Sequence, residues 1–529
     1  EKVPFTPRGI GSTGLGGAVP VSGGVAIDLS HLKGVRDIDP AAGVATIRAG
    51  SIFYFAQQTL DEHGLVFRSR PTNAFGTLGG WAAAGGLGLG SLAAGPLREQ
   101  ARSIQLVRPD GSLERLDSGA DGFDELFDTE GQLGIFTELT LELDRVSGGS
   151  QVIGLLFDDL AAAVEHASAL MSGEALPRTV MLAGRTSEHE GLPGVDEGEL
   201  MLVEAAAGTG LAAPPDGAHE LPAGVIGRLW QRRFFPMDNP LGPVFLASEA
   251  IFPADRVPRF VRAARRLTGR YGVPLHGHSY AVQGGDEPAI LVLLTFPADP
   301  RQGWHHLMLT PLAAALTAAA VRHGGKPYGV GIWNTPFARR TFGDDRLRRV
   351  EGAKRALDPE GLLNPGKFFR VGTDVALLPA LMSPGVYPAS LRMAGLATPM
   401  LMKRHDPSAL PSATEERCIA CGACVPVCLA VAATGAESVS GRAKLALMRR
   451  ISAKDELDDD ELLGSQRCLK CGQCAEVCAR SLELLEAWEE LEVKVRERVD
   501  DARFREIIQR FAAQVDDNRD ELVLPVALP

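Results

Sequence analysis

All eight cysteines of this 529-residue chain fall between Cys418 and Cys478. They form two runs with the same spacing, C-x2-C-x2-C-x3-C. That spacing wraps three thiolates around one 4Fe–4S cluster and sends the fourth thiolate to the neighbouring cluster. The first predicted ligand set is Cys418, Cys421, Cys424 and Cys478. The second predicted set is Cys468, Cys471, Cys474 and Cys428.

Structural zinc is the competing interpretation of these runs, because zinc also favours paired C-x2-C units with four ligands per ion. Two complete four-cysteine runs favour iron. The 39 residues between the runs include a helical pattern over 441–451 and an acidic stretch, Asp455–Glu461. This arrangement resembles the helical two-cluster ferredoxin module of succinate dehydrogenase and heterodisulfide reductase subunits. A charged amphipathic pattern over 482–513 predicts one long helix after it.

Glycine dominates the beginning of the chain. Residues 7–20 read PRGIGSTGLGGAVP, and such a loop can turn several backbone N–H groups toward a diphosphate. A flexible loop would have a similar composition, so the order of the later segments matters. Strand patterns at 24–29, 32–39 and 44–50 precede a helix pattern at 53–63. The segments PTNAFGTLGG at 71–80 and EGQLGIFT at 130–137 come next.

This ordered series resembles the FAD-binding domain of the vanillyl-alcohol oxidase and D-lactate dehydrogenase (glycolate oxidase subunit) superfamily. The segment LDPEGLLNPGK at 357–367 is similar to the closing segment of that family, which returns to the flavin. The resemblance covers about residues 7–370. The FAD-binding residues that it implies are Arg8, Gly9, Gly11, Ser12, Thr13, Gly14, Thr77, Gly79, Gly80, Gly134, Ile135, Asn364 and Lys367. The His or Cys that tethers flavin in some relatives is missing from 7–17, so we expect noncovalent FAD.

The implied fold class is α+β. We expect a PCMH-type FAD-binding domain whose first lobe is largely missing, an α+β cap domain and an all-α ferredoxin domain. The expected boundaries are 1–145 for the FAD-binding domain, 146–340 for the substrate or cap domain and 341–372 for the closing segment. They are 373–412 for an apolar linker, 413–485 for the ferredoxin domain and 486–529 for a C-terminal helix and tail.

Candidates for catalysis lie in the cap region. His276 and His278 alternate as on a strand, so both can face one side, and an imidazole suits proton removal from an alcohol. A purely structural role, with the two histidines buried for packing or exposed at a strand end, has at least equal weight. Tyr328 is a third candidate base. Arg339, next to Arg340, could hold a carboxylate in a two-pronged salt bridge or could be a surface charge.

A divalent metal in the cap domain is doubtful. In related D-2-hydroxyacid dehydrogenases the cap carries a His-x6-His pattern, but Gly285 stands seven residues after His278. The net charge of −12 disfavours nucleic acid as a main partner. No stretch of 18 or more apolar residues lacks Gly, Pro or charge, so no transmembrane segment is expected. With every cysteine assigned to clusters, a reducing cytoplasm is the expected location, and any membrane association would arise through a partner.

We therefore expect an FAD- and iron–sulfur-dependent dehydrogenase that oxidises a small 2-hydroxyacid resembling lactate, glycolate or 2-hydroxyglutarate. Electrons would leave one at a time through two 4Fe–4S clusters. The acceptor would be a separate subunit, such as a protein with cysteine-rich CCG domains, since this chain has no cysteines left for one. The alternative is an electron-transfer subunit of a heterodisulfide-reductase-like complex without substrate oxidation of its own. The sequence does not identify the substrate, the acceptor or the oligomeric state.

Overall fold

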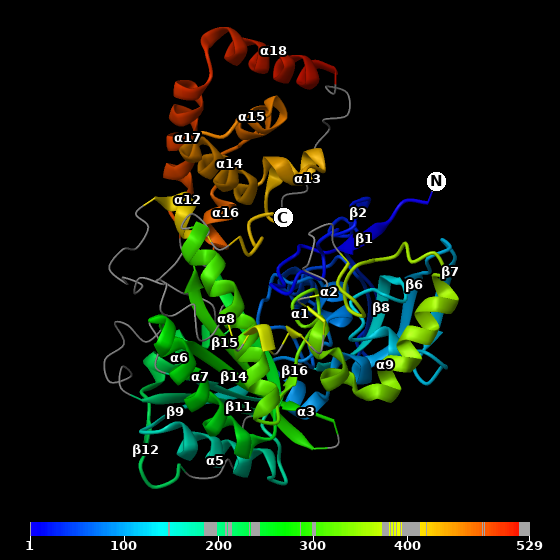
Figure 1. The fold of residues 1–529 in the computed structure, drawn as a ribbon, viewed down its shortest axis with the longest axis vertical. Helices are drawn as coiled ribbons and strands as arrows, with labels where there is room; N and C mark the ends of the chain where they lie inside the picture. Colours follow the sequence, from blue (N-terminus) through cyan, green and yellow to red (C-terminus); the bar gives the residue numbers. More distant parts are fainter. Residues whose placement is uncertain are drawn as a thin grey trace. The chain divides into compact units, whose positions relative to one another are not determined.

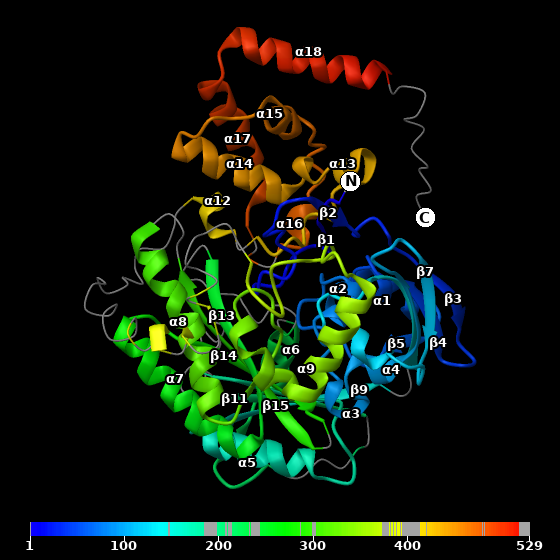
Figure 2. The same cartoon turned by 45° about the vertical axis from the view of Figure 1, so that its right-hand side comes forward.

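The computed structural model describes residues 2–145, 149–184, 198–206, 214–231, 244–285, 287–298, 303–372, 413–418, 420–478 and 482–517, with a few single residues between these ranges. The chain divides into two compact units, Glu1–Ser408 and Ala409–Pro529, drawn in Figure 1 and turned in Figure 2. The predicted linker at 373–412 lies almost wholly outside the described residues, and the finer division into six parts remains a prediction.

The first part of unit 1 is an antiparallel sheet in the order β3-β4-β8-β6-β7, with β5 also paired to β8. Its strands are β3 (Val35–Asp39), β4 (Val44–Arg48), β5 (Leu65–Phe67), β6 (Ala101–Val107), β7 (Leu113–Asp117) and β8 (Ile135–Arg145). Helices α1 (Phe53–Asp61), α2 (Leu78–Ala83), α4 (Leu97–Gln100) and α9 (Ala338–Leu357) pack against this sheet. Buried aromatic rings such as Phe53, which lies 4.8 Å from Phe67 between ring centroids, fill the core. The predicted strands and helix at the start of the chain are therefore present.

The chain returns to its own beginning after α9. Strand β1 (Phe5–Arg8) pairs in parallel with β2 (Val25–Asp28). On its other side Phe5 donates to the carbonyl of Leu362 at 2.8 Å and accepts from the amide of Asn364 at 2.7 Å. The segment around 358–368 thus lies beside the glycine-rich loop that comes after β1, as the family resemblance implied.

The second part of unit 1 is an eight-stranded sheet in the order β12-β9-β11-β10-β14-β15-β13-β16. All its pairings are antiparallel. Its strands are β9 (Ser150–Phe157), β10 (Thr179–Ala183), β11 (Glu199–Ala206), β12 (Ala218–Glu220), β13 (Val244–Phe252), β14 (His276–Gln283), β15 (Pro288–Ala298) and β16 (Lys326–Pro327). This sheet and its helices give the α+β architecture that the sequence predicted.

Alternation along the strands gives this sheet two different faces. Helices α5 (Leu160–Met171), α7 (Val257–Tyr271) and α8 (Gly303–Arg322) cover one face and form a large apolar core with it. The side chain of Asp159 caps helix α5 by accepting hydrogen bonds from the amides of Ala161 and Ala162. The opposite face meets α6 (Ala223–Gln231) and Leu89, which lies just before α3 (Ser91–Ala94), while Leu92 of α3 belongs to the first core. Both predicted histidines lie on β14 within this sheet.

Unit 2 is helical throughout its described residues. Its helices are α12 (Thr414–Arg417), α13 (Leu429–Thr434), α14 (Gly441–Ala453), α15 (Asp459–Gln466), α16 (Gln473–Glu476), α17 (Leu484–Arg498) and α18 (Asp501–Asp517). Trp488 and Leu491 of α17 pack on Leu445 and Met448 of α14 in a core that also contacts several cysteines. The all-α expectation for this unit is confirmed.

The single long helix predicted over 482–513 is wrong, because the chain breaks between α17 and α18. Val499 is extended, and the Asp500 carboxylate accepts from the amides of Ala502 and Arg503 at 2.9 Å each. A capping aspartate competes with continuation of the helix, and it begins a new one here. The predicted amphipathic period runs through the break because both pieces turn an apolar side to the same core.

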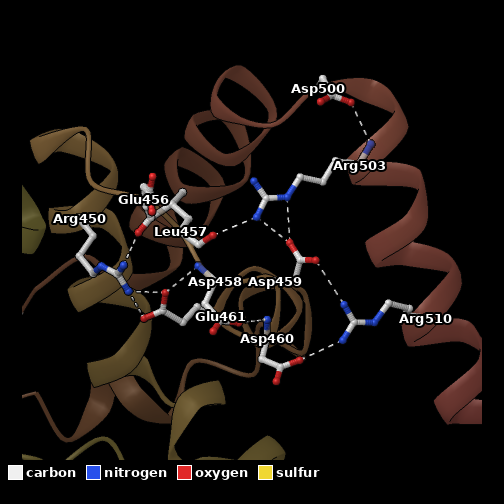
Figure 3. A network of polar contacts seen from close by, with 10 residues as sticks. All are labelled: Arg450, Glu456, Leu457, Asp458, Asp459, Asp460, Glu461, Asp500, Arg503 and Arg510. Carbon is white, nitrogen blue, oxygen red and sulfur yellow. Dashed lines mark hydrogen bonds and ion pairs between the residues drawn. The ribbon is translucent and has the colours of Figure 1, made fainter.

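The acidic stretch before the second cysteine run also has a structural role. Asp458 and Glu461 form a capping box at the start of α15, and Arg450 pairs with Glu461. Figure 3 shows how Arg503 and Arg510 of α18 reach the carboxylates of α15. These ion pairs are largely exposed, so each contributes little stability alone. No helix in the described part of the chain is long and apolar enough to cross a membrane.

Candidate active site and cluster-binding sites

The glycine-rich loop lies against the Thr77 turn. A Cβ placed on Gly9 would sit 2.2 Å from the Thr77 hydroxyl oxygen, so no larger residue fits there. A Cβ on Gly80 would sit 2.8 Å from the same hydroxyl. Within the described residues, the amides at positions 11–14 donate no hydrogen bond. The two segments predicted to bind the diphosphate are thus adjacent, and one of them presents free N–H groups as an anion nest does.

Glu130 fastens this loop to the segment 329–332. Its carboxylate accepts from the amides of Val330 at 2.7 Å and Gly331 at 2.8 Å. The amide of Ile332 in turn donates to the carbonyl of Leu15 at 2.8 Å. Burial raises the pKa of Glu130, while the two amide hydrogen bonds oppose that rise. Glu130 belongs to the sequence motif at 130–137, but nothing in that motif indicated these hydrogen bonds to residues 330 and 331.

The closing segment supplies two buried polar side chains. Lys367 donates from Nζ to the carbonyls of Gly17, at 2.9 Å, and Val19. Burial lowers the pKa of Lys367 to about 8, against the attraction of Glu130. Asn364 is fully buried, and its Nδ2 donates to the Glu130 carbonyl at 2.8 Å. Its Oδ1 is buried and accepts no hydrogen bond among the described residues, which fits an acceptor waiting for a ligand donor.

Gly134 lies where two strands pack too closely for a side chain. A Cβ at this position would meet Leu106 Cδ1 at 2.4 Å and the Val107 carbonyl oxygen at 3.2 Å. The requirement therefore comes from the close packing of β6 on the start of β8. Ile135, the next residue, is buried and pairs with Val107.

His276 and His278 lie on one face of β14, and both are buried. Burial, with a smaller effect from His278, lowers the pKa of His276 to about 4. The Nε2 atom of His276 has no hydrogen-bond partner among the described residues. Among those residues no group of three His, Cys, Asp or Glu side chains is placed to hold a single metal ion. The two imidazoles thus lie enclosed on one face of the sheet.

The surroundings of Tyr328 and Arg339 bear on their candidate roles. The hydroxyl of Tyr328 accepts from the amide of Leu87 at 3.0 Å, and burial raises its pKa well above the ordinary value. A phenol held in this way keeps its proton at neutral pH. Arg339 lies on the exposed side of α9 with three quarters of its side chain in solvent, beside Asp344 at 3.6 Å. That position corresponds to the surface-charge alternative and not to a buried carboxylate site.

A carboxylate that sequence reasoning missed lies on the same sheet face as His278. Glu249 on β13 is directly opposite Leu293 on β15, which is directly opposite His278 on β14. Burial raises the pKa of Glu249 to about 7. The Tyr328 amide donates to the Glu249 carbonyl at 3.1 Å, so the three candidate groups belong to one neighbourhood. Glu249 is the one charged residue in the mostly apolar segment 244–252, and this was the sequence signal that could have identified it.

Two partly buried arginines were also missed. Burial, with a smaller effect from the nearby charge of Arg70, lowers the pKa of Arg233 to about 9. Glu204, held by the Thr179 hydroxyl at 3.0 Å, is the acidic group that opposes this effect. Arg178 and Asp61 also act on Arg70, so charges of both signs gather at this place.

Cysteines of both runs meet in unit 2. One cavity in unit 2 is lined by Cys428, Cys468, Cys471 and Cys474, together with Trp488. The fourth cysteine of the first run therefore joins three cysteines of the second run.

The other predicted set gathers in the same crossed manner. Burial, together with the nearby Cys418 and Cys478, raises the pKa of Cys421 to about 11. Burial also raises the pKa of Cys424, with Cys418, Cys421 and Cys478 among the neighbours that add to the rise. Two groups of four thiols suit two cubane clusters, each held by cysteines of both runs.

Comparison with known proteins agrees with this arrangement. Residues 1–117 match the FAD binding domain family, residues 150–368 match the C-terminal domain of FAD linked oxidases and residues 415–482 match the 4Fe-4S dicluster domain. A D-lactate dehydrogenase of Anaerostipes hadrus is 25% identical over 408 residues, covering 69% of this chain and 84% of that protein. Glycolate oxidase subunit GlcD of Bacillus subtilis is 23% identical over 402 residues, covering 70% and 84%.

A solved alkyldihydroxyacetonephosphate synthase structure shares the fold. It covers 69% of this chain and 72% of its own, with a TM-score of 0.51 and 18% identity. The dicluster match decides between iron and zinc in favour of iron. The chain is therefore an FAD-linked oxidoreductase of the superfamily that contains D-lactate dehydrogenases and glycolate oxidase subunit GlcD, and it carries a 4Fe–4S dicluster domain.

Proposed function

We propose that the protein oxidises a small 2-hydroxyacid and passes the electrons singly through two 4Fe–4S clusters to a separate partner protein. The observation that carries the substrate half is the enclosed sheet face bearing His276, His278 and Glu249, in the same unit as the FAD-binding segments. Bound FAD accepts a hydride equivalent and can return the electrons one at a time, and clusters carry single electrons. The relatives named for D-lactate and glycolate support this substrate class.

FAD is proposed to be held without a covalent bond. The free amides at 11–14 and the Thr77–Gly80 turn would take the diphosphate, as their exposed N–H groups and adjacency suggest. Lys367 and the Asn364 side-chain oxygen would lie at the flavin, since one is a buried cation and the other an unused buried acceptor. Acid precipitation should then leave all the flavin in the supernatant, and flavin that stays with the protein would contradict this part.

His278 is the proposed base for the substrate hydroxyl, with His276 second. An imidazole can take the proton only when it is neutral, and burial keeps His276 in that form at pH 7. Tyr328, whose hydroxyl is bound to the Leu87 backbone, is better suited to position the loop at 85–87 than to accept a proton. Arg339 is exposed and is not part of the proposed site.

The electron acceptor is proposed to be a separate subunit, such as a protein with cysteine-rich CCG domains. All eight cysteines of this chain are assigned to the two proposed clusters, which leaves none for such a domain. For the same reason we propose a reducing, cytoplasmic location.

The test is anaerobic reduction of the bound flavin by a panel of D- and L-2-hydroxyacids, followed by absorbance. At least one should bleach the flavin in the wild-type protein, and His278→Gln should slow this by about 10²–10⁴-fold. His219→Gln, an exposed histidine on the edge strand β12, is the matched control and should react normally. If no 2-hydroxyacid bleaches the flavin, the electron-transfer-subunit alternative becomes the better account.

A further inference from the structure

Lys444 on α14 is a buried lysine in the core of unit 2, and it is 2% exposed. Its Nζ donates to the Val439 carbonyl at 2.6 Å and lies 5.6 Å from the centre of the Trp488 ring. Among the residues that the structure describes, no carboxylate forms an ion pair with it. A carbonyl and an aromatic ring offer only partial negative charge, so the protein leaves most of the charge of this ammonium without compensation.

Other cations on the same helix do have acidic partners. Arg442 pairs with Glu437, and Arg450 pairs with Glu461. A lysine that leaves water without a counter-charge is costly, and fully buried lysines are rare unless they are paired. The buried position of Lys444 therefore indicates that an anion other than a carboxylate lies nearby.

The second group of cysteines lies next to this ammonium. The Val439 oxygen that accepts from Lys444 lies 4.0 Å from Sγ of Cys428, so a single carbonyl separates the ammonium from a predicted cluster ligand. Trp488 lines the cavity that contains Cys428, Cys468, Cys471 and Cys474. The Lys444 ammonium is thus near this cavity through Val439 and through Trp488.

The first group of cysteines approaches the same turn of α14. Gly441 lies three positions before Lys444, and a Cβ on Gly441 would lie 3.4 Å from Sγ of Cys424. The start of α14 therefore borders ligands of both predicted clusters, and it carries one buried positive charge.

We propose that Lys444 is the buried counter-charge of the cluster pair, and that it makes reduction of the cluster held by Cys428, Cys468, Cys471 and Cys474 easier. A 4Fe–4S cluster with four thiolates carries about two negative charges when oxidised and about three when reduced. On reduction the cluster gains one electron from an external donor while Lys444 keeps its proton. A fixed cation attracts the reduced form more strongly than the oxidised form, which raises the reduction potential.

The experiment compares the wild-type holoprotein with three variants at position 444. Lys444→Met keeps an unbranched chain without charge, Lys444→Gln keeps a neutral N–H donor, and Lys444→Arg keeps the charge. Lys454→Met is the matched control, because Lys454 is an exposed lysine at the end of the same helix.

Iron is counted first, and each cluster is then titrated anaerobically with dithionite and EPR detection. The inference rests on the proposed clusters, and a wild-type protein without iron would contradict that assignment and not the role of Lys444. Because dithionite is the reductant, the result does not depend on whether the protein oxidises a 2-hydroxyacid.

Lys444→Met and Lys444→Gln should both shift at least one couple toward more negative potential. The expected change is about tenfold in the reduction equilibrium, or about 59 mV for a one-electron couple. It should persist at about 1 M salt, because a buried charge is screened much less than an exposed one. Lys444→Arg and Lys454→Met should keep wild-type potentials.

Unchanged potentials in both neutral variants, or an equal shift in Lys454→Met, would overturn the proposal. A shift in Lys444→Met but not in Lys444→Gln would overturn it too, because the hydrogen bond and not the charge would then be responsible. Loss of iron from all three variants would show that Lys444 serves packing. Loss of iron from the two neutral variants alone would support the proposal, since Lys444→Arg differs from them in keeping the charge.

Discussion

The Glu130 carboxylate is the most informative single point at which to disturb the FAD-binding region. Glu130→Ala removes the acceptor of two amides, those of Val330 and Gly331. Leaving a buried donor without a partner costs about 1–3 kcal/mol. The free energy of unfolding should therefore fall by about 2–6 kcal/mol. Glu130→Gln keeps an acceptor but loses the charge, so its cost should be nearer to about 1–2 kcal/mol.

The same change should weaken FAD binding. Without Glu130 the segment 329–332 no longer holds the glycine-rich loop through the bond from Ile332 to Leu15. A loss of about 1.4 kcal/mol of binding free energy corresponds to tenfold in the dissociation constant. We expect at least that in Glu130→Ala. The assays are denaturant unfolding of the FAD-bound protein and titration of flavin into the apoprotein by fluorescence quenching.

Glu125→Gln is the matched control. Glu125 lies five positions earlier and pairs with the exposed Arg349 at 3.1 Å, so its loss should cost no more than about 0.5 kcal/mol. If Glu130→Ala unfolds like the control and binds FAD as tightly as wild type, the hydrogen bonds from Val330 and Gly331 to Glu130 contribute neither to stability nor to FAD binding. The reasoning about how the loop is held would then be refuted.

Three further results are expected. Cys421→Ser and Cys471→Ser should each lower the iron content from eight to about four atoms per chain with FAD still bound, and zinc in the preparation would contradict the assignment. Gly134→Leu should give less stable protein with little bound flavin, because the new side chain meets β6. Gly269→Leu is the control and should lower stability only slightly, because nothing lies within 4 Å of its Cβ. Equal stability and flavin content in the two variants would refute the packing argument. The pKa of Glu249 is raised to about 7, so the folded protein favours the protonated carboxyl group. The free energy of unfolding should therefore fall by about 3 kcal/mol as the pH rises from about 5 to 8. Glu249→Gln should remove this pH dependence.

Local patterns predicted much of the fold because they depend on near neighbours in sequence. The helix Leu160–Met171 was predictable from its apolar period and the capping Asp159. The crossed cysteine groups could be predicted from spacing alone. The break after Val499 was missed because the apolar period continues across it, although the Val-Asp-Asp sequence there offered a capping signal.

Contacts between distant segments were beyond sequence reasoning. Glu130 meets Val330 two hundred positions later, and no pattern in either segment points to the other. Glu249 and His278 are brought onto one face only by the strand order of the sheet, with Leu293 between them. The exposure of Arg339 was equally hidden, because a charged residue near a helix start fits a surface and a binding site alike.

The central claim is that substrate electrons pass from the flavin to the clusters of the same chain. Rapid anaerobic mixing of the holoprotein with a 2-hydroxyacid, with samples frozen at intervals, follows flavin absorbance and the cluster EPR signal together. The flavin should bleach first, and the EPR signal of reduced clusters should then rise without added mediator. In Cys471→Ser the amplitude of that EPR signal should fall by about half. A flavin that bleaches fully while both clusters stay oxidised would contradict the claim.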